Sequence, residues 1–439
     1  MHVAILGGGI SGLTTAYYLN KAGIEFTLIE KGKPGGCIQS DSIDQSIVDF
    51  GPNTIRDKDG SILKLIEELG ISSQLLTISE DFKTRYIVRD GQLCALKAHP
   101  NSLLKSPILP FRDKLRILKE PFIKGDYHPS ESVQEFFERR IGSEATKYLV
   151  DPIFSGIYAG DISVMSAKEI VPTLMEFEKN HGSIFKGIIS KGGKEKHSPT
   201  ILNFKNGIQT LTDALYAKIE KHVIIDEVRE IEKSDAGYTI TLNEGKTNAS
   251  HVISTLPAYV LSSLIRDWDP TLSYHLSDIQ YPPILSTQLI FNQRDIDFQQ
   301  KGFGFLVPRV EKIKLLGAIW KTNLFGAHTI EGRLQFNLLA GGAHNTAIYL
   351  NDEGHVIDEF KSILQTEAEP IVVKSKLWKH AIPQFHIGYH KIRNHMDAFE
   401  QEHPKFYIGG NFKWGVSIPD CVRGGSEIAD LFRNMKLPS

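Results

Sequence analysis

The chain has 439 residues, enough for two or three domains with large cores. Its 50 basic and 52 acidic residues leave a formal net charge of −2, and no basic patch is interleaved with aromatic residues, which argues against a nucleic-acid-binding protein. No stretch approaches the ~18 consecutive apolar residues of a membrane span. Scattered histidines and three widely spaced cysteines predict no metal site and indicate reduced thiols in a cytoplasmic protein.

The first thirty residues carry a dinucleotide-binding pattern. An apolar strand over 1–6 runs into Gly7-Gly8-Gly9-Ile10-Ser11-Gly12, and a helical pattern and a second strand, ending at Glu30, follow. Because the pattern starts at once, no signal peptide is expected. The glycine spacing permits a tight turn, close approach to a pyrophosphate and close helix packing. The helix N-terminus offers N–H groups to the phosphates, and Glu30 is placed to accept hydrogen bonds from ribose hydroxyls.

Three further segments favour FAD over a nicotinamide cofactor. A second glycine pair, Gly35-Gly36, follows Glu30 closely, and a strand over 48–50 is broken by Gly51-Pro52-Asn53-Thr54. Near the C-terminus, a strand over 406–408 enters a glycine turn, and 415–418 lead into a terminal helix of about a dozen residues. A glycine-rich strand end that returns from the distant C-terminus is suited to the ribityl chain and ring of an extended FAD.

From 81 to 199 the pattern changes twice. Two short strands, 85–88 and 92–96, flank a hairpin signal at Arg89-Asp90-Gly91. From Pro100 the pattern becomes helical, and the stretch 186–199, rich in glycine, lysine and histidine, is expected to be an exposed loop. The predicted helices are 112–120, 132–140, 144–153 and 167–178.

The second half first resembles the continuation of a nucleotide-binding domain and then becomes rich in strands. Its first strands, at 222–225, 228–233, 238–242 and 251–255, include Val228, whose backbone is expected beside adenine. Strands at 286–291, 303–308, 315–320 and 334–339 predict a separate antiparallel sheet, followed by a helix over 355–365 and a strand over 371–378. The predicted fold class is therefore α/β. It comprises a discontinuous Rossmann-type FAD-binding domain (1–80, 200–260 and 380–439), an antiparallel-sheet substrate domain (81–99 and 261–379) and a helical insertion (100–199).

Motifs along nearly the whole chain resemble those of the protoporphyrinogen oxidases, within the amine-oxidase-like flavoproteins. The most specific are 302–308, Gly-Phe-Gly-Phe-Leu-Val-Pro, and 158–161, Tyr-Ala-Gly-Asp; further matches lie at 51–54, 151–152, 381–385 and 410–417. The resemblance implies a six-electron oxidation of protoporphyrinogen IX to protoporphyrin IX, with O₂ as acceptor and hydrogen peroxide as product, in haem biosynthesis.

The resemblance also implies which residues hold the substrate. Arg85 resembles a propionate-binding arginine, Leu306, Ile319 and Leu339 resemble apolar clamps on the rings, and Gly160 resembles a loop glycine close to the reacting ring. A surface salt bridge for Arg85, core roles for the apolar residues and an ordinary turn at Gly160 are the alternatives. No general base is identified, because the flavin carries the hydride chemistry. The predicted FAD contacts are Gly7, Gly8, Gly9, Ile10, Ser11, Gly12, Glu30, Lys31, Gly36, Gly51, Pro52, Asn53, Thr54, Val228, Trp378, Gly410, Asn411, Val416, Ser417 and Ile418.

Other functions and partners stay open at this point. Oxidation of coproporphyrinogen III, the reaction of related bacterial proteins, is the nearest alternative; an amine oxidase with Trp414 in an aromatic cage and a non-catalytic escort-type binding protein are more distant ones. The segment 103–124 interleaves apolar and basic residues, which predicts either contact with an anionic membrane surface or a helix packed on its own domain. A homodimer is a candidate assembly, and a cytoplasmic enzyme with peripheral membrane contact is expected.

Overall fold

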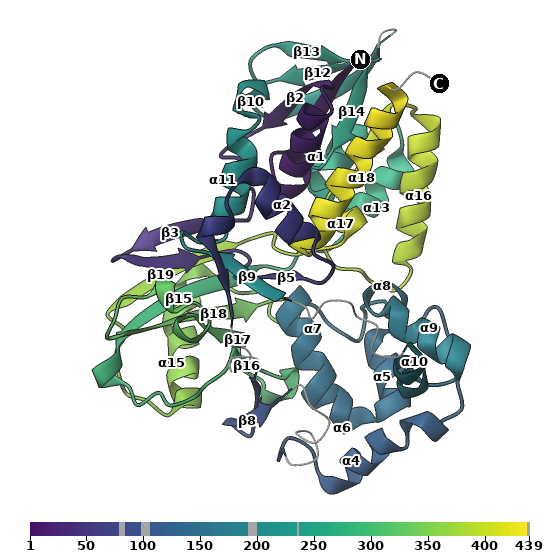
Figure 1. The fold of residues 1–439 in the computed structure, drawn as a ribbon. Helices are drawn as coiled ribbons and strands as arrows, with labels where there is room; N and C mark the ends of the chain where they lie inside the picture. Colours follow the sequence, from purple (N-terminus) through teal and green to yellow (C-terminus); the bar gives the residue numbers. More distant parts are fainter. Residues whose placement is uncertain (79–83, 98–105, 192–199, 235–236, 437–439) are drawn as a thin grey trace.

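A computed structural model describes residues 1–78, 84–97, 106–191, 200–234 and 237–436 (Figure 1). The ribbon has a mixed region that carries both termini, a strand-rich region below it and a helical region beside the latter (Figure 1). Among the described helices, none is both long and apolar enough to cross a lipid bilayer. The predicted α/β class is confirmed, and two sheets account for most of the site described below.

The first sheet is parallel and carries the glycine motif. Its strand order is β10-β2-β1-β14-β20, and all neighbouring strands run parallel. Val3 and Ile5 of β1 face one apolar core, whereas Ala4 and Leu6 face another, as expected for a sheet covered on both sides. The strands are β1 (His2–Leu6), β2 (Glu25–Glu30), β10 (Val223–Ile225), β14 (His251–Ser254) and β20 (Phe406–Ile408).

Helices cover both faces of this sheet (Figure 1). The terminal helix α18 is longer than expected, because it continues along α1 to residue 436. The helices of the other face were not predicted from the sequence. The first face carries α1 (Ile10–Lys21), α2 (Ser61–Leu69), α11 (Gln209–Ala217) and α18 (Ile418–Lys436), and the second carries α12 (Ala258–Ile265), α13 (Pro270–Ser277) and α16 (Tyr389–Glu402).

The second sheet has seven strands in the order β19-β15-β18-β17-β16-β7-β8. It is antiparallel as predicted, except that β7 and β16 run parallel. One face packs on α15 (Glu353–Leu364), where Phe305, Phe336 and Phe360 form part of an apolar core. The strands are β7 (Arg85–Arg89), β8 (Gln92–Leu96), β15 (Ile284–Asn292), β16 (Gly304–Leu306), β17 (Leu315–Trp320), β18 (Arg333–Gly341) and β19 (Val372–Trp378).

Smaller sheets connect these two layers. A hairpin of β3 (Ser40–Ile43) and β4 (Ser46–Asp49) turns at Asp44 and Gln45, both with positive φ. One small sheet joins β5 (Ile55–Asp57), β6 (Leu75–Thr77) and β9 (Thr200–Phe204), and another joins β11 (Val228–Ser234), β12 (Gly237–Leu242) and β13 (Lys246–Ala249). Of these, β3, β5, β6, β9 and β13 were not predicted as strands.

The helical region follows the predicted plan with one error. The expected loop at 186–199 is wrong for 186–191, which belong to α10; residues 192–199 lie outside the described residues. A Cβ at Gly187 would lie 2.3 Å from the Phe177 side chain, so this glycine permits α10 to pack on α9 rather than breaking the helix. The helices are α4 (Phe111–Leu118), α5 (Val133–Ile141), α6 (Ser143–Ala145), α7 (Asp151–Tyr158), α8 (Ala167–Ile170), α9 (Pro172–His181) and α10 (Ile184–Lys191), with a π-helical segment (Thr146–Val150) before α7.

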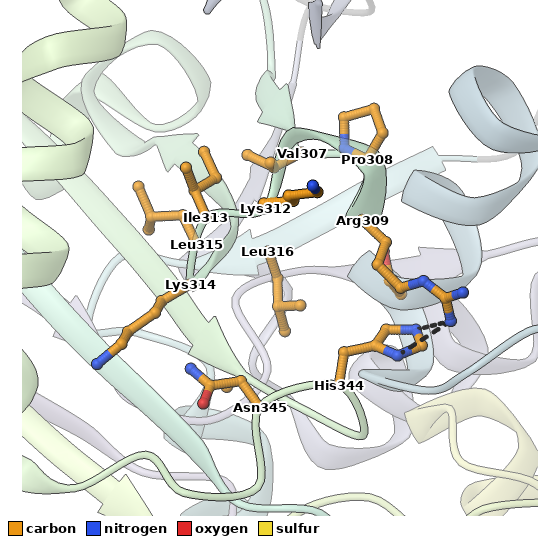
Figure 2. A pocket seen from close by; sticks show the side chains of 12 residues that line it. Val307, Pro308, Arg309, Lys312, Ile313, Lys314, Leu315, Leu316, His344 and Asn345 are labelled. Atoms are coloured by element: carbon orange, nitrogen blue, oxygen red, sulfur yellow. Dashed lines mark hydrogen bonds between the residues drawn. The ribbon is translucent and has the colours of Figure 1, made fainter.

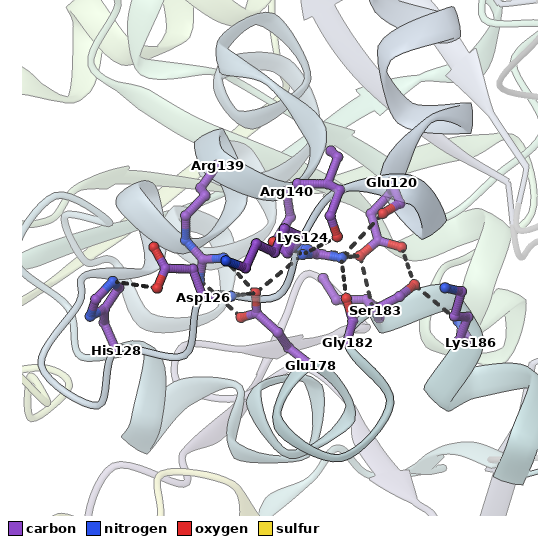
Figure 3. A network of polar contacts seen from close by, with 12 residues as sticks. Glu120, Lys124, Asp126, His128, Arg139, Arg140, Glu178, Gly182, Ser183 and Lys186 are labelled. Atoms are coloured by element: carbon purple, nitrogen blue, oxygen red, sulfur yellow. Dashed lines mark hydrogen bonds and ion pairs between the residues drawn. The ribbon is translucent and has the colours of Figure 1, made fainter.

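A buried ionic network holds the helical region together (Figure 3). Arg140 of α5 donates hydrogen bonds to Glu120 at 2.8 Å and to Glu178 of α9 at 3.1 Å. Glu120 also accepts from the hydroxyl of Ser183 at 2.6 Å and from the first backbone N–H of α10, at Ile184, at 2.9 Å. Burial alone would raise the pKa of Glu120, but these hydrogen bonds hold it below its ordinary value. The ionised carboxylate therefore joins α5 to α10, and Arg140 joins α5 to α9.

Candidate active site

The glycine turn after β1 leaves open space where a pyrophosphate is expected. Gly7 has φ 100° and donates its N–H to Ile29 O at 2.8 Å. A Cβ at Gly12 would lie 1.9 Å from Gly7 O, whereas a Cβ at Gly9 would meet nothing within 4 Å. Gly9 is also the N-cap of α1 and offers no side chain to the helix terminus. The first and third glycines thus shape the turn, and the second leaves room for a ligand at the helix N-terminus, beside Ile10 and Ser11.

Glu30 is fixed at the end of β2 by the neighbouring backbone. Its two carboxylate oxygens accept hydrogen bonds from Gly8 N at 2.6 Å and Gly32 N at 3.0 Å. Its carbonyl accepts from Asp226 N at 2.9 Å, which brings the start of β11, at Val228, to this end of the sheet. The structure therefore places Glu30 and Val228 together, as a ribose and adenine site requires, and Lys31 lies exposed beside Glu30.

A second glycine cluster faces the first. A Cβ at Gly36 would lie 3.3 Å from the Cα of Gly9, and one at Gly51 would lie 1.9 Å from Cys37 O. After Gly51-Pro52 comes Asn53, whose side-chain N–H donates to Gly51 O at 3.0 Å. The Asn53 Oδ1 is buried and accepts no hydrogen bond from any described residue. Because a buried acceptor without a donor is costly, this atom fits a site completed by a bound group, and Thr54 lies next to it.

The C-terminal segment brings a second helix N-terminus to this place. Gly410, with φ 100°, turns the chain from β20 into α17 (Asn411–Trp414), and Val416 and Ser417 lead into α18 at Ile418. A Cβ at Gly425 would lie 3.0 Å from Ser11 O, so α18 packs closely on the first turns of α1 (Figure 1). The four distant segments of the predicted FAD site are thus adjacent.

Trp414 has a different environment from the one a cage residue needs. A Cβ at Gly409 would lie 2.5 Å from its ring, and one at Gly424 would lie 2.1 Å from it. The ring packs against the core that α1 and α18 share. This packing argues against the aromatic-cage interpretation, because Trp414 serves the core of the first sheet.

Strand register places four predicted substrate residues on one face of the second sheet. Leu306 pairs with Gly317 and Gly317 with Leu339, while Gly304 pairs with both Arg85 and Ile319. Directly paired residues share a face, so the side chains of Arg85, Leu306, Ile319 and Leu339 point to the same side. This face is opposite to the one that packs on α15.

The same face is turned toward the turn after β4, which carries predicted FAD contacts, as the polar residues of the face show. Gln288 and Asn337, which pair with each other, donate to Asp49 O at 2.8 and 3.4 Å. Trp378, also on this face, donates its indole N–H to Phe50 O at 2.9 Å. The sequence analysis missed Gln288 and Asn337, although alternation along β15 and β18 was the available signal. The predicted substrate residues therefore share a face with Trp378, a predicted FAD contact, and this face meets the turn that carries further ones.

This face has different neighbours at Leu306 and at Arg85. Leu306 meets α7, where a Cβ at Gly156 would lie 2.6 Å from the leucine side chain. The Arg85 guanidinium lies 4.2 Å from the centre of the Phe303 ring, and burial together with the charge of Arg56 lowers its pKa. Arg56, on β5, was missed by the sequence analysis and adds a second positive charge beside Arg85.

Gly160 has a tighter environment than expected. A Cβ there would lie 2.5 Å from Gln384 Oε1, and the preceding Ala159, with φ 51°, accepts a hydrogen bond from Ala343 N at 2.7 Å. Gln384 donates to Tyr158 O at 2.8 Å. The absence of a side chain at Gly160 is thus required by Gln384, and its approach to a substrate ring stays a prediction.

A pocket of about 380 Å³ lies between α7 and the loops that follow β16 and β18 (Figure 2). Arg309 lines it and contacts His344 Nδ1 at 3.3 Å and Asp161 at 3.3 Å, while its backbone N–H donates to Asp151 at 2.8 Å. The two most specific sequence motifs therefore meet through Arg309, which fixes α7 to the second sheet. In the described part of the chain, no three histidine, cysteine or acidic side chains gather as a metal site would require.

Comparison with known proteins agrees with this architecture. The family model of flavin-containing amine oxidoreductases matches residues 10–431. A mitochondrial protoporphyrinogen oxidase of Nicotiana tabacum is 29% identical over 477 residues, covering 98% of this chain and 94% of the relative. A coproporphyrinogen III oxidase of Bacillus subtilis (strain 168) is 26% identical, covering 98% and 97%. A solved protein from Exiguobacterium sp. 255-15, provisionally named a protoporphyrinogen oxidase, has a TM-score of 0.84 at 20% identity and 99% coverage of both chains.

The family match covers most of the chain and agrees with the geometry of the dinucleotide site. The open space at Gly9, the fixed carboxylate of Glu30 and the free acceptor of Asn53 fit the predicted cofactor, FAD. The expected resemblance to protoporphyrinogen oxidases is also confirmed over nearly the full length of the chain. The chain belongs to the flavin-containing amine oxidoreductase family.

Proposed function

We propose that this enzyme oxidises a porphyrinogen to a porphyrin, with protoporphyrinogen IX as the substrate, O₂ as the electron acceptor and hydrogen peroxide as the second product. The observation that carries the proposal is the shared face of Arg85, Leu306, Ile319 and Leu339, turned toward the turn after β4. A cation at one end and apolar side chains along the face suit a tetrapyrrole with propionates on one edge. The near-full-length relatives named as porphyrinogen oxidases support the same class of substrate.

Bound FAD would supply the hydride acceptor, and the protein orients the substrate and excludes water from the site. Arg85 holds a propionate through a charge-assisted contact, which orients the macrocycle. Leu306, Ile319 and Leu339 exclude water from its apolar rings, and α7 closes the end of the face at Gly156. We assign no residue as general base, because the pyrrole N–H protons are released to solvent.

The deciding experiment follows porphyrin fluorescence with purified, flavin-loaded protein. Protoporphyrinogen IX and coproporphyrinogen III are supplied at matched concentrations, once under air and once under argon, and hydrogen peroxide is measured in parallel. We expect fluorescence to rise faster with protoporphyrinogen IX, only under air, with one peroxide formed for each electron pair removed. Equal rates with boiled protein would reject the enzyme assignment, and equal turnover under argon would reject O₂ as acceptor.

Coproporphyrinogen III is a second candidate because Arg85 lies within electrostatic reach of a second arginine. Arg56 is near enough to Arg85 to lower its pKa, and a substrate with two more propionates gains more from a second cation. Replacing Arg56 by Ala should then reduce kcat/KM for coproporphyrinogen III more than for protoporphyrinogen IX. An equal effect on both substrates would remove this support.

We also propose that α4 and the turn after it contact an anionic membrane surface. Phe111, Leu115 and Leu118 follow helical spacing and are 74%, 42% and 53% exposed, and Phe122 is 87% exposed. A helix packed on its own domain would bury these side chains, so their exposure favours the interfacial alternative. Lys119, which is exposed between Leu118 and Phe122 in the chain, is positioned for anionic headgroups. Residues 103–105 of the predicted segment lie outside the described residues.

Vesicle pelleting tests this surface. The protein should sediment with phosphatidylserine-containing vesicles at low salt and should be released in ~0.5 M salt, where charges are screened. Phe111→Ser combined with Phe122→Ser should abolish pelleting, whereas Ile189→Ser, which changes a 76% exposed residue on α10, is the matched control. Pelleting that is unaffected by the double change would place the contact elsewhere.

A further inference from the structure

A lysine and an aspartate form an ion pair that is completely buried between the two main sheets. Lys321, at the start of α14 (Lys321–Leu324), contacts Asp49 Oδ2 at 2.6 Å, and both side chains are 0% exposed. Asp49 ends β4, 272 positions earlier in the chain. Removing two charges from water is costly, and an apolar pair of similar size is often as stable. Stability alone therefore does not explain this pair.

Asp49 is held from several directions at once. Its Oδ1 accepts from the Ser40 hydroxyl at 2.6 Å and from Ile208 N at 3.0 Å, and its Oδ2 accepts from Asn203 Nδ2 at 2.9 Å. The backbone carbonyl of Asp49 accepts a hydrogen bond from the side-chain amide of Gln288 on the second sheet. The pKa of Asp49 is below its ordinary value, because the Lys321 charge and these donors outweigh burial, which alone would raise it. Asp49 is thus an ionised anchor for the residues that follow it.

Those residues include Gly51, Pro52 and Asn53, which are predicted contacts of FAD. Asn203 donates to Asn53 O at 2.8 Å as well as to Asp49, so one amide joins both ends of the turn. Between these ends, Phe50 O accepts from the Trp378 indole N–H. A movement of Lys321 would be transmitted through Asp49 and Asn203 to Asn53, whose Oδ1 is the buried atom without a described donor.

We propose that Lys321 is a positioning residue for the cofactor: through Asp49 and Asn203 it sets the shape of the turn 50–53 beside the ring of FAD. The proposal rests on the assignment of this turn as a flavin support and not on the choice of porphyrinogen. It predicts that removing the ion pair changes the environment of the flavin even in a variant that keeps the native fold.

The test separates positioning from stability. Lys321→Met alone leaves a buried, unpaired carboxylate and is expected to destabilise the apoprotein. The double variant Lys321→Met/Asp49→Asn removes both charges and should recover most of the thermal stability. Lys321→Gln keeps a hydrogen-bond donor and should give an intermediate result. Lys314→Met is the matched control, because Lys314, just before β17, forms a 2.7 Å ion pair with Asp352, just before α15 and away from the turn.

The readouts are the apoprotein Tm, the Kd for FAD from quenching of flavin fluorescence, and the visible circular dichroism of the bound flavin. For the double variant we expect a Tm near that of the native protein, a Kd raised ~10-fold and an altered visible spectrum. Lys321→Gln should raise Kd less, and Lys314→Met should leave Kd and spectrum unchanged. A double variant with native Kd and native spectrum would overturn the proposal; if it does not fold, native values in Lys321→Gln would do the same. None of these readouts uses a porphyrinogen, so they are independent of the substrate assignment.

Discussion

Replacing Glu30 by Ala should weaken FAD binding by an amount that the hydrogen bonds around the carboxylate allow us to estimate. Its oxygens accept from Gly8 N and Gly32 N, so the loop holds the carboxylate in place before any ligand arrives. A hydrogen bond from a ribose hydroxyl to this charged group contributes ~1.5–3 kcal/mol. Its loss corresponds to a rise in Kd of about 10- to 150-fold. Gly8 belongs to the glycine turn where the pyrophosphate is expected, so loss of its hydrogen bond to Glu30 would also loosen that turn. We therefore expect a rise in Kd toward the upper end of this range.

Two measurements separate the roles of this carboxylate. Titration of apoprotein with FAD, followed by fluorescence quenching, gives Kd, and thermal unfolding of the apoprotein reports the loop bonds alone. Glu30→Gln keeps one acceptor oxygen and should give an intermediate Kd. A Glu30→Ala protein with a Kd within about twofold of the native one would refute the ribose contact. A lower Tm together with an unchanged Kd would indicate that Glu30 stabilises the loop but does not bind the ribose.

Three other substitutions have definite expected outcomes. The Gly9→Val variant should fold, since nothing lies within 4 Å of a Cβ placed at this position, but it should be purified without flavin. A fully flavinated product would contradict the assignment of the turn. Arg85→Ala should raise KM far more than it lowers kcat, and Arg85→Lys should restore only part; unchanged steady-state kinetics would return Arg85 to a structural role. Glu120→Gln should cost ~3–5 kcal/mol in urea unfolding, because Arg140 loses a buried partner. Since the pKa of Glu120 is lowered in the fold, its contribution is present at neutral pH and should fade as the pH falls below its ordinary 4.5; a pH-independent difference between the two proteins would contradict this.

Local patterns were sufficient for much of the fold. The strand, glycine turn and helix at the N-terminus are specified by neighbours in the sequence, and so is the hairpin around Asp90-Gly91. The strands at 303–308, 315–320 and 334–339 were predicted from the sequence, and their register then brings Leu306 and Leu339 to one face. Each of these features depends on contacts between residues close in sequence or on the strict period of two along a strand.

The parts that could not be predicted depend on distant partners. Glycine and lysine around Gly187 suggested a loop, but Phe177 of α9 fills the space that the missing side chain leaves. Lys321 follows a strand and precedes polar residues, which is typical of an exposed turn; only the position of Asp49 on another sheet makes it a buried cation. The proposed role of Arg56 likewise depends on its position relative to Arg85 in the fold. Such pairings have no local signature.

The parallel pairing of β7 with β16 has a consequence for the growing chain. Arg85 and Gly304 are neighbours in the sheet but about 220 positions apart in the sequence. At ~5–20 residues per second, a ribosome needs on the order of 10–40 s to make the second strand after the first. During that interval the hairpin of β7 and β8 presents a row of unsatisfied backbone groups to any other strand nearby. Chains truncated before Gly304 are therefore expected to aggregate through this hairpin, and a binder that covers the edge of β7 during synthesis should raise the yield of the full-length protein.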